Sequence, residues 1–234
     1  MNHDFKARYA IYYAPEEESP LHDFGTRWLG RNAITGQEVA NYSVPGFSGE
    51  RVRELTESPR HYGFHGALKA PFHLGNGTQP EQLYAAVCSL ASEINSFCLE
   101  PLELRCLDEF LALVPSQPNQ QLSDLAAECV RRLDSFRAPP SAAELAKRRH
   151  AKLTETQQAM LARWGYPYVM AEFRFHLSLT GTMKNAWERE RIFPWADLLT
   201  RPVRREPLKI TSVCVFEQPN REAPFRLARR FRLP

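Results

Sequence analysis

Two stretches of the sequence, YGFHGALK at residues 62–69 and FRFHLSLT at residues 173–180, are built alike. Each places a histidine, His65 or His176, inside an apolar run typical of a β-strand, with a small residue two positions later. If two such strands lie side by side, they bring two imidazoles to one cleft. Two imidazoles can supply a general acid and a general base for chemistry on a phosphate ester.

Side chains two positions apart in a strand share a face of the sheet. The first histidine is therefore expected to face the same way as Ala67 and Lys69, and the second the same way as Ser178 and Thr180. These neighbours would add short polar groups and one cation to the predicted cleft.

The composition is that of an ordinary globular protein. The chain has 234 residues, is 43% hydrophobic and 24% charged, and carries a formal net charge of +3. This length is enough for one large domain or a two-lobed one. The charge is too balanced to indicate bulk binding of nucleic acid, although it allows a local anion site.

The cysteines and the apolar runs bear on where the protein acts. There are five cysteines, an odd number with no CxxC pair, which favours a reduced, cytoplasmic protein. The first six residues are polar and show no signal core. No apolar run approaches the roughly 18 residues of a membrane helix.

The first half of the chain alternates between strand-like and helix-like patterns. Prolines and glycines punctuate it, with stops expected at Pro59 and Pro71. The predicted strands are 8–14, 63–70, 102–107 and 110–114, and the predicted helices are 20–31, 50–57, 81–95 and 120–133.

The second half continues with a strongly helical, basic stretch at 141–163. It is read as a solvated helical hairpin, with a lid or an anionic-substrate rim as the alternative. Strands are predicted at 170–180, 207–216 and 225–231, and a helix interrupted near Pro194 at 185–199.

Other catalytic motifs are absent from the sequence. There is no HExxH or HxH metal motif, no GxSxG elbow, no GxxxxGK[ST] phosphate loop and no GxGxxG. His61 and His65 are four apart, but Pro59 and Gly63 argue against the helix that such a metal pair needs. We therefore expect no metal site and no cofactor. A lone histidine in an apolar strand is usually structural, so the catalytic reading depends on the matched pair.

Longer stretches around both histidines resemble the 2H phosphoesterase superfamily, which includes RNA 2′,3′-cyclic phosphodiesterases, also called 2′-5′ ligases. RHYGFHGALKAPF at 60–72 and WGYPYVMAEFRFHLSLTG at 164–181, together with RYAIYYAP at 8–15 and WLGR at 28–31, are similar to one branch. That branch is encoded near phosphonate-utilisation operons. The resemblance covers nearly the whole chain.

The resemblance implies a fold and a mechanism. The fold is α+β, a single bilobal domain over 1–234, with two pseudo-symmetric lobes whose antiparallel sheets form a central cleft, plus a helical insertion at about 139–165. The mechanism is metal-independent: one of His65 and His176 acts as general base and the other as general acid. The hydroxyl residue of each motif binds the phosphate.

The first motif departs from the family pattern, because Ala67 stands where the family has Thr or Ser. Alanine cannot donate a hydrogen bond to phosphate, and loss of one such donor costs about 3 kcal/mol in comparable sites. Lys69 on the same predicted face could supply a cationic contact instead. The second motif, with Ser178, is intact.

Further substrate-binding candidates are aromatic or cationic. Tyr12, Tyr62 and Tyr168 could stack on a base or sugar, although packing is the ordinary role of such tyrosines. Arg174 shares the strand parity of His176 and could approach a phosphate, with surface solvation as its alternative. Thr180 completes the predicted site.

These observations predict a cytoplasmic cyclic phosphodiesterase. Its substrate would be a 2′,3′-cyclic phosphate, as on an RNA end, or a small sugar cyclic phosphate, which would suit phosphonate catabolism. The alternative is a non-catalytic or weakened binder of phosphorylated nucleotide or RNA, suggested by Ala67 and by the basic helical stretch near Lys147. No membrane association and no obligate protein partner are inferred. The sequence leaves open which histidine is the acid.

Overall fold

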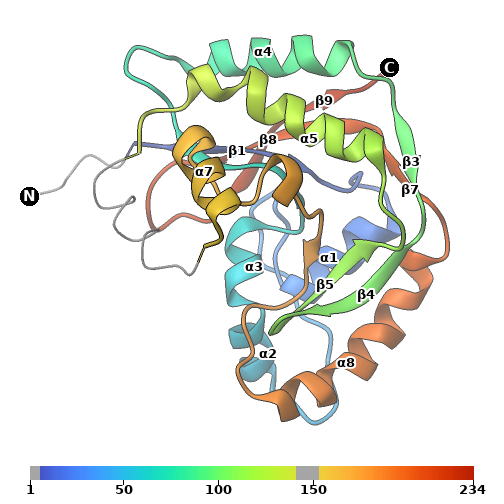
Figure 1. Cartoon of the computed structure of the whole chain (residues 1–234). Coiled ribbons are helices and arrows are strands. Elements are labelled where there is room, and N and C mark those ends of the chain that lie inside the picture. Colours follow the sequence, from blue (N-terminus) through green and yellow to red (C-terminus); the bar gives the residue numbers. More distant parts are fainter. Residues whose placement is uncertain (1–5, 141–152) are drawn as a thin grey trace, which may run out of the picture.

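A seven-stranded sheet in the order β4-β5-β6-β2-β1-β8-β9 forms the centre of the computed structural model, which describes residues 6–140 and 153–234 (Figure 1). Every neighbouring pair in it is antiparallel. A second, two-stranded antiparallel sheet pairs β3 with β7. The predicted α+β class with antiparallel sheets is confirmed. The strands are β1 (Arg8–Tyr13), β2 (Gly66–His73), β3 (Phe97–Leu99), β4 (Leu102–Leu107), β5 (Phe110–Pro115), β6 (Leu177–Ser178), β7 (Leu208–Ile210), β8 (Ser212–Gln218) and β9 (Arg226–Arg232).

Helices pack against the sheet. In Figure 1, α4 and α5 lie side by side; α4 packs on β8 and β9 and α5 packs on β2, while α8 lies along the β4–β5 hairpin. The α-helices are α1 (Pro20–Leu29), α2 (Gly49–Leu55), α3 (Glu57–Tyr62), α4 (Pro80–Ser92), α5 (Gln120–Arg132), α7 (Glu155–Trp164) and α8 (Ala186–Thr200). Short 3-10 helices are η1 (Asp134–Phe136), η2 (Met170–Glu172) and η3 (Arg201–Arg204).

The two faces of the sheet differ in what they bury. Along β1, Tyr9, Ile11 and Tyr13 join a large apolar core together with side chains of α1, α4 and α5. Ala10 and Tyr12 alternate with them and belong to a smaller cluster on the opposite face. The strand is thus apolar on both sides, as expected of a central strand.

Helix α1 shows how local sequence sets the position of the second histidine segment. The Ser19 side chain accepts a hydrogen bond from the His22 backbone at its start, and Gly30 ends it with a φ of 74°. Trp28 is buried and donates from Nε1 to the Leu179 carbonyl at 2.8 Å. This bond ties α1 to the residue that follows β6.

The two expected sheets are halves of one continuous sheet. Strands β1, β2, β8 and β9 form one half and β4, β5 and β6 the other. They join through the pairing of β2 with β6, where Gly66 lies opposite Leu177. The junction therefore lies beside the two histidines.

Both histidine strands begin later than predicted. The first, expected at 63–70, is β2 at Gly66–His73 and runs through Pro71, close to a register shift in its pairing with β1. The second, expected at 170–180, shrinks to Leu177–Ser178. Its predicted first part contains η2, which begins at Met170 with a φ of 56°.

Two prolines do not stop helices as predicted. Pro59 lies in the first turn of α3, where a missing N–H costs nothing, and the chain stays helical to Tyr62. Pro194 lies inside an unbroken α8. The predicted final strand 207–216 is two strands in different sheets, β7 and β8.

The remaining predicted elements of the described residues are confirmed within a few positions, including the β4–β5 hairpin and helices α1, α4 and α5. Residues 141–152, the basic part of the predicted helical insertion, lie outside the described residues. Within the described ranges, no helix is long and apolar enough to cross a membrane.

Candidate active site

His65 stands just before β2 and is fixed on two sides. Its Nδ1 lies 2.8 Å from the Gly63 carbonyl oxygen, and its ring stacks on Tyr12 with 3.7 Å between ring centroids. Gly63 has a φ of 80°, and a Cβ there would lie 2.5 Å from that of Ala33. Glycine is therefore required at the turn that presents this carbonyl.

His176 stands just before β6 and repeats the same bond. Its Nδ1 lies 2.9 Å from the carbonyl oxygen of Arg174, again two residues earlier. The Phe110 ring flanks it at 5.6 Å between centroids. A carbonyl oxygen can only accept, so in both neutral histidines Nδ1 carries the proton and Nε2 keeps its lone pair.

The sheet register brings the two histidines to one face. Gly66 pairs with Leu177, so one step outward His65 lies opposite Ser178 and Ala67 lies opposite His176. Diagonal neighbours in such a pair have Cβ atoms roughly 7–8 Å apart, a span that a phosphoryl group can bridge. The two segments are closely packed, since a Cβ on Gly66 would lie 2.3 Å from the Phe175 ring.

The surroundings hold both histidines neutral in the free protein. Burial lowers the pKa of His65 to about 4; the bond to the Gly63 carbonyl opposes this shift, and the charge of His176 adds to it. Burial also lowers the pKa of His176, opposed by the Arg174 carbonyl. An anion between the rings would raise both pKa values, because it favours the charged imidazolium.

A cavity of 620 Å³ opens beside His176. Ala67 and Ala70 of β2 line it on one side, and the β4–β5 turn lines it on another. Tyr166 and Tyr168, whose rings meet edge to face at 5.7 Å, complete its wall. This volume suits a small phosphorylated molecule.

Some of the predicted site residues line this cavity, and others lie close to His65. Arg174 and Tyr168 line it together with His176. Ser178 is half-buried and lies opposite His65 in the register. Tyr62 lies on the His65 side, 6.3 Å from that ring, and stacks on Phe225 at 5.2 Å.

The predicted orientation of Lys69 is wrong. The register of β2 with β1 shifts so that Ala67 pairs with Tyr12 but Lys69 pairs with Ile11, which faces the large core. Lys69 is 4% exposed, and its Nζ lies 3.4 Å from both the Val130 carbonyl and Asp134 Oδ1. The bulge thus turns Lys69 away from the face of His65.

Thr180 and Tyr12 also have other partners than those predicted. Thr180 is buried, and its Oγ1 accepts a hydrogen bond from the Leu111 backbone at 2.9 Å, which joins the end of the His176 segment to β5. Tyr12 is 1% exposed, and its ring supports His65. Neither group is presented to the cavity.

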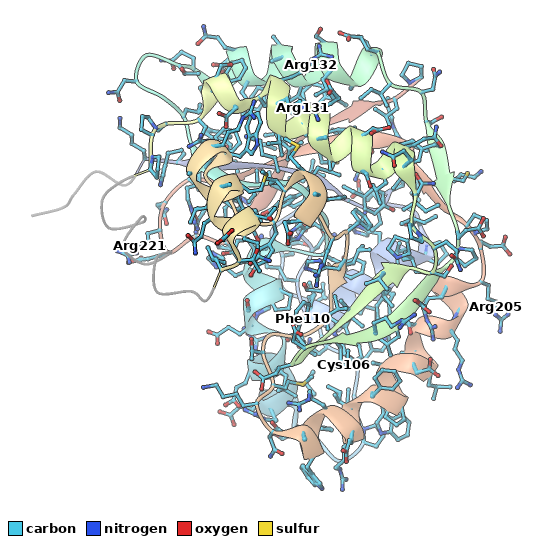
Figure 2. All side chains as sticks on the ribbon, viewed as in Figure 1. Cys106, Phe110, Arg131, Arg132, Arg205 and Arg221 are labelled. Carbon is cyan, nitrogen blue, oxygen red and sulfur yellow. The ribbon has the colours of Figure 1, made fainter. Side chains whose placement is uncertain are left out.

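Sequence reasoning missed the contribution of the β4–β5 turn. Cys106, Asp108 and Phe110 line the cavity, and Figure 2 shows Phe110 and Cys106 together at that end of the hairpin. The sequence predicted the hairpin but carried no signal that its turn reaches the second histidine.

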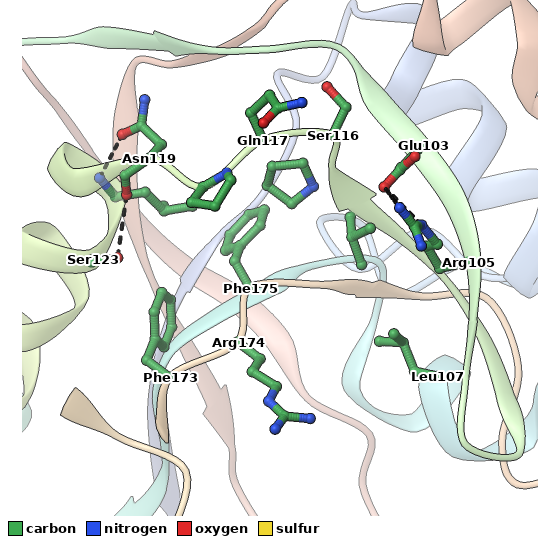
Figure 3. A pocket seen from close by; sticks show the side chains of 14 residues that line it. Glu103, Arg105, Leu107, Ser116, Gln117, Asn119, Ser123, Phe173, Arg174 and Phe175 are labelled. Atoms are coloured by element: carbon green, nitrogen blue, oxygen red, sulfur yellow. Dashed lines mark hydrogen bonds and ion pairs between the residues drawn. The ribbon is translucent and has the colours of Figure 1, made fainter. Parts of the chain in front are cut away.

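A second hollow, of 430 Å³, adjoins the segment that leads to His176 and shares Leu107, Phe173 and Arg174 with the first cavity. Pro115, Pro118 and Phe175 are among its lining residues. Figure 3 shows Phe175 and Arg174 pointing to opposite sides of their segment. This alternation agrees with the prediction that Arg174 and His176, two positions apart, point to the same side of the segment.

Two further chemical features concern metals and thiols. Among residues 6–140 and 153–234, no three His, Cys, Asp or Glu side chains are grouped so as to hold a metal ion. All five cysteines are free thiols, and Cys129 and Cys214 are buried.

Comparison with known proteins gives a family and two curated relatives. A family model described as "Protein of unknown function (DUF1045)" matches residues 67–226. A protein of Janthinobacterium sp. (strain Marseille) is 39% identical over 179 residues, covering 76% of this chain and 40% of the relative. One of Laribacter hongkongensis (strain HLHK9) is 31% identical over 226 residues, covering 95% of this chain and 51% of the relative. Both are named "Ribose 1,5-bisphosphate phosphokinase PhnN", and the chain spans about half of their length or less.

Solved structures with a similar course of the chain include E. coli LigT complexed with 3′-AMP and a protein described as a phosphoesterase. The LigT complex aligns over 97% of this chain and 98% of its own, with a TM-score of 0.42 and 14% identity. The phosphoesterase aligns over the same shares of the two chains, with a TM-score of 0.40 and 13% identity.

Proposed function

The chain belongs to the DUF1045 family, and we propose that it hydrolyses a cyclic phosphodiester with His65 and His176 as its acid–base pair, without a metal ion or other cofactor. The observation that carries the proposal is the repeated bond from Nδ1 to the carbonyl two residues earlier. It leaves two Nε2 atoms, on one face of the sheet, for proton transfer.

The proposed reaction needs two proton transfers. Nε2 of one histidine takes a proton from water as the water oxygen forms a bond to phosphorus. Nε2–H of the other gives its proton to the ester oxygen as the phosphorus–oxygen bond of the ring breaks. The product is an open phosphomonoester, and each imidazole ends in the protonation state from which the other began.

We assign the base to His65 and the acid to His176. His65 has a pKa of about 4 in the free protein and so stays neutral over a wide range. His176 lines the cavity, where a bound phosphate anion would raise its pKa and load it with a proton. The assignment is a proposal about hydrolysis; in ring closure the roles would reverse.

In this proposal two side chains bind the phosphoryl oxygens. Ser178, opposite His65, has a hydroxyl that can donate, and Arg174 lines the cavity with a guanidinium suited to phosphate. Donors aimed at the phosphoryl oxygens stabilise the charge that develops in the transition state. Tyr168 and Tyr62 would contact the sugar or base from opposite ends of the cleft.

The relatives favour a substrate built on ribose. Their name assigns them a kinase activity on ribose 1,5-bisphosphate, yet at least about half of each relative lies outside the matched region. The 234 residues contain no GxxxxGK[ST] loop for a nucleotide triphosphate. We propose that this chain is a separate, phosphodiesterase-type unit acting on a ribose cyclic phosphate or an RNA end. The PhnN names agree with the resemblance to the phosphonate-operon branch.

A binder that lacks turnover is the second candidate, and Ala67 favours it. The position faces His176 across the strands and offers no hydrogen-bond donor. A binder of phosphorylated nucleotide or RNA would keep its affinity when both histidines are replaced. Binding through several phosphates would also weaken steeply as salt increases.

The test is a phosphodiesterase assay in excess chelator on 2′,3′-cyclic nucleotides and ribose cyclic phosphates. We expect turnover of at least one ribose cyclic phosphate, and its loss in the His65→Ala, His176→Ala double variant. Binding of the same compounds by the double variant is measured in parallel. Retained affinity with no turnover by the unaltered protein would support the binder and contradict the enzyme.

A further inference from the structure

The segment 166–169 contributes to the wall of the cavity and belongs to no strand; in it two exposed tyrosines alternate with the buried Pro167 and Val169. Tyr166 is 37% exposed and Tyr168 46%. Both follow Gly165, which ends α7 with a φ of 73°. What holds the end of α7 therefore bears directly on their position relative to His176.

Arg137 contacts this helix end directly. Its Nη2 donates to the Arg163 carbonyl at 3.4 Å, and a Cβ on Gly165 would lie 2.9 Å from its Nη1. The guanidinium packs so closely on the Gly165 backbone that a larger residue there would displace it. Asp134 orients the guanidinium through two bonds, at 2.8 Å to Nε and 3.2 Å to Nη2.

The backbone around Arg137 is anchored to β2 and the loop after it. Arg137 forms an isolated antiparallel bridge with Leu74. Ala138 donates to the His73 carbonyl at 2.8 Å, and Gly75 donates to the Phe136 carbonyl at 2.9 Å. Arg137 thus joins the end of the strand that begins beside His65 to the end of α7.

The buried Lys69 completes this connection. Its ammonium group lies 3.4 Å from Asp134 Oδ1, the oxygen that also accepts from Arg137 Nε. Asp134 is therefore held between a cation of β2 and the cation that reaches α7. A second contact braces the same region, since Gln157 of α7 donates to Glu172 of η2 at 2.9 Å.

We propose that Arg137, oriented by Asp134, is a positioning residue that sets Tyr166 and Tyr168 against the His176 cavity and so determines affinity for the substrate. The substrate follows from the proposed function, whereas the placement of the wall does not depend on it. Arg137 itself is not among the residues that line the cavity.

The first experiment measures backbone hydrogen exchange of residues 163–170 in the full chain and in Arg137→Ala. Loss of the contact should increase exchange there by at least about tenfold, because opening of a weakly packed segment governs exchange. Arg131→Ala is the matched control: Arg131 is an exposed arginine of α5 paired with Glu128, and its loss should leave that exchange unchanged (Figure 2). Unchanged exchange in folded Arg137→Ala would overturn the proposal.

The second measurement separates binding from chemistry on whichever cyclic phosphate is turned over. Arg137→Ala should raise KM about tenfold with kcat within about threefold, the signature of lost substrate binding. Arg137→Lys keeps the positive charge, so it should show a smaller rise in KM and a smaller increase in hydrogen exchange than Arg137→Ala. A fall in kcat at unchanged KM would contradict a positioning role.

Failure of the two proposals can be told apart. If the unaltered protein hydrolyses no cyclic phosphate, the proposed function fails, and the exchange data alone decide the role of Arg137. If Arg137→Ala does not fold, Arg137→Lys and Asp134→Asn serve instead. Normal exchange of residues 163–170 in both of these would overturn the proposal.

Discussion

The imidazole of His65 is held before any substrate arrives. The Gly63 carbonyl fixes its tautomer and the Tyr12 ring fixes its plane, so little reorganisation is needed at the moment of reaction. His176 has the same carbonyl bond but a looser ring contact, with Phe110. Tyr12, which sequence reasoning offered as a residue that stacks on the substrate, stacks on His65 instead.

The lowered pKa values predict an acidic optimum for kcat/KM. His65 must be neutral to act as base, so activity should fall as pH drops through about 4. His176 must be protonated to act as acid, and its pKa lies below the ordinary 6.5, so activity should also fall as pH rises toward neutrality. A bell-shaped profile of kcat/KM with its maximum between these limits is the expected result.

The profile of kcat should be displaced to higher pH than that of kcat/KM. The reason is that kcat reports the complex, in which the phosphate anion raises the pKa of both histidines. Steady-state kinetics from pH 3 to pH 9 check both profiles. Coincident profiles with a maximum above pH 8 would contradict the assignment.

Restoring a donor at Ala67 should increase turnover. Lys69 faces the core and cannot replace the missing hydroxyl, so Ala67→Thr is expected to raise kcat by about tenfold or more. The control is Ala70→Thr, which adds a hydroxyl on the same strand and at the same cavity, but not at the position two residues after His65. Equal rates in both variants and the unaltered protein would show that other donors already suffice.

At the scale of elements, a β-bulge separates residues that a regular strand would keep together. The shift between Tyr12 and Ile11 moves Lys69 from the cleft face to the side of α5. Strand periodicity predicts faces only while the pairing stays in register. No local feature of GALKAPF marks the bulge, because it comes from the pairing with β1.

Ser178 and Thr180 are two positions apart and should respond in opposite ways. Ser178→Ala should lower kcat by about tenfold or more with little change in stability, because Ser178 lies opposite His65 in the register and its hydroxyl is the proposed donor to the phosphoryl group. Thr180→Val should leave kcat unchanged but lower the free energy of unfolding by about 1–2 kcal/mol, because the buried Leu111 N–H would lose its hydrogen-bond acceptor. Kinetics and urea unfolding of both variants make the comparison, and a fall in kcat for Thr180→Val would place Thr180 in the site.

The sequence predicted which helices and strands exist better than it predicted where they end and which strands pair. Helix α1, predicted over 20–31, begins at Pro20 as predicted but ends two residues early, at Leu29. The strand of His176 was overestimated, because 173–176 has aromatic and apolar residues typical of a strand but no partner along that length. The histidines themselves were found from their matched contexts, whereas Phe110 and Asp108 reach the cavity only through tertiary folding.

At the scale of the whole molecule, the central claim rests on where the sheet is joined. One half contributes β2 and the other β6, and the short pairing between them lies beside both histidines. A two-lobed, pseudo-symmetric description of this sheet is a proposal that the repeated histidine geometry supports. Loss of the β2–β6 pairing would separate the two proposed proton-transfer groups.

The most direct test compares three histidine variants in excess chelator: His65→Ala, His176→Ala and His73→Ala. His73 lies at the far end of β2, and its Nδ1 also lies near a carbonyl, that of Ala7 at 3.2 Å. We predict that the first two lower kcat/KM on a ribose cyclic phosphate by about 10²–10⁴-fold, the usual contribution of a general acid or base, and that His73→Ala stays within about twofold. Turnover that survives in either cleft variant, or that falls equally in all three folded proteins, would contradict a two-histidine mechanism.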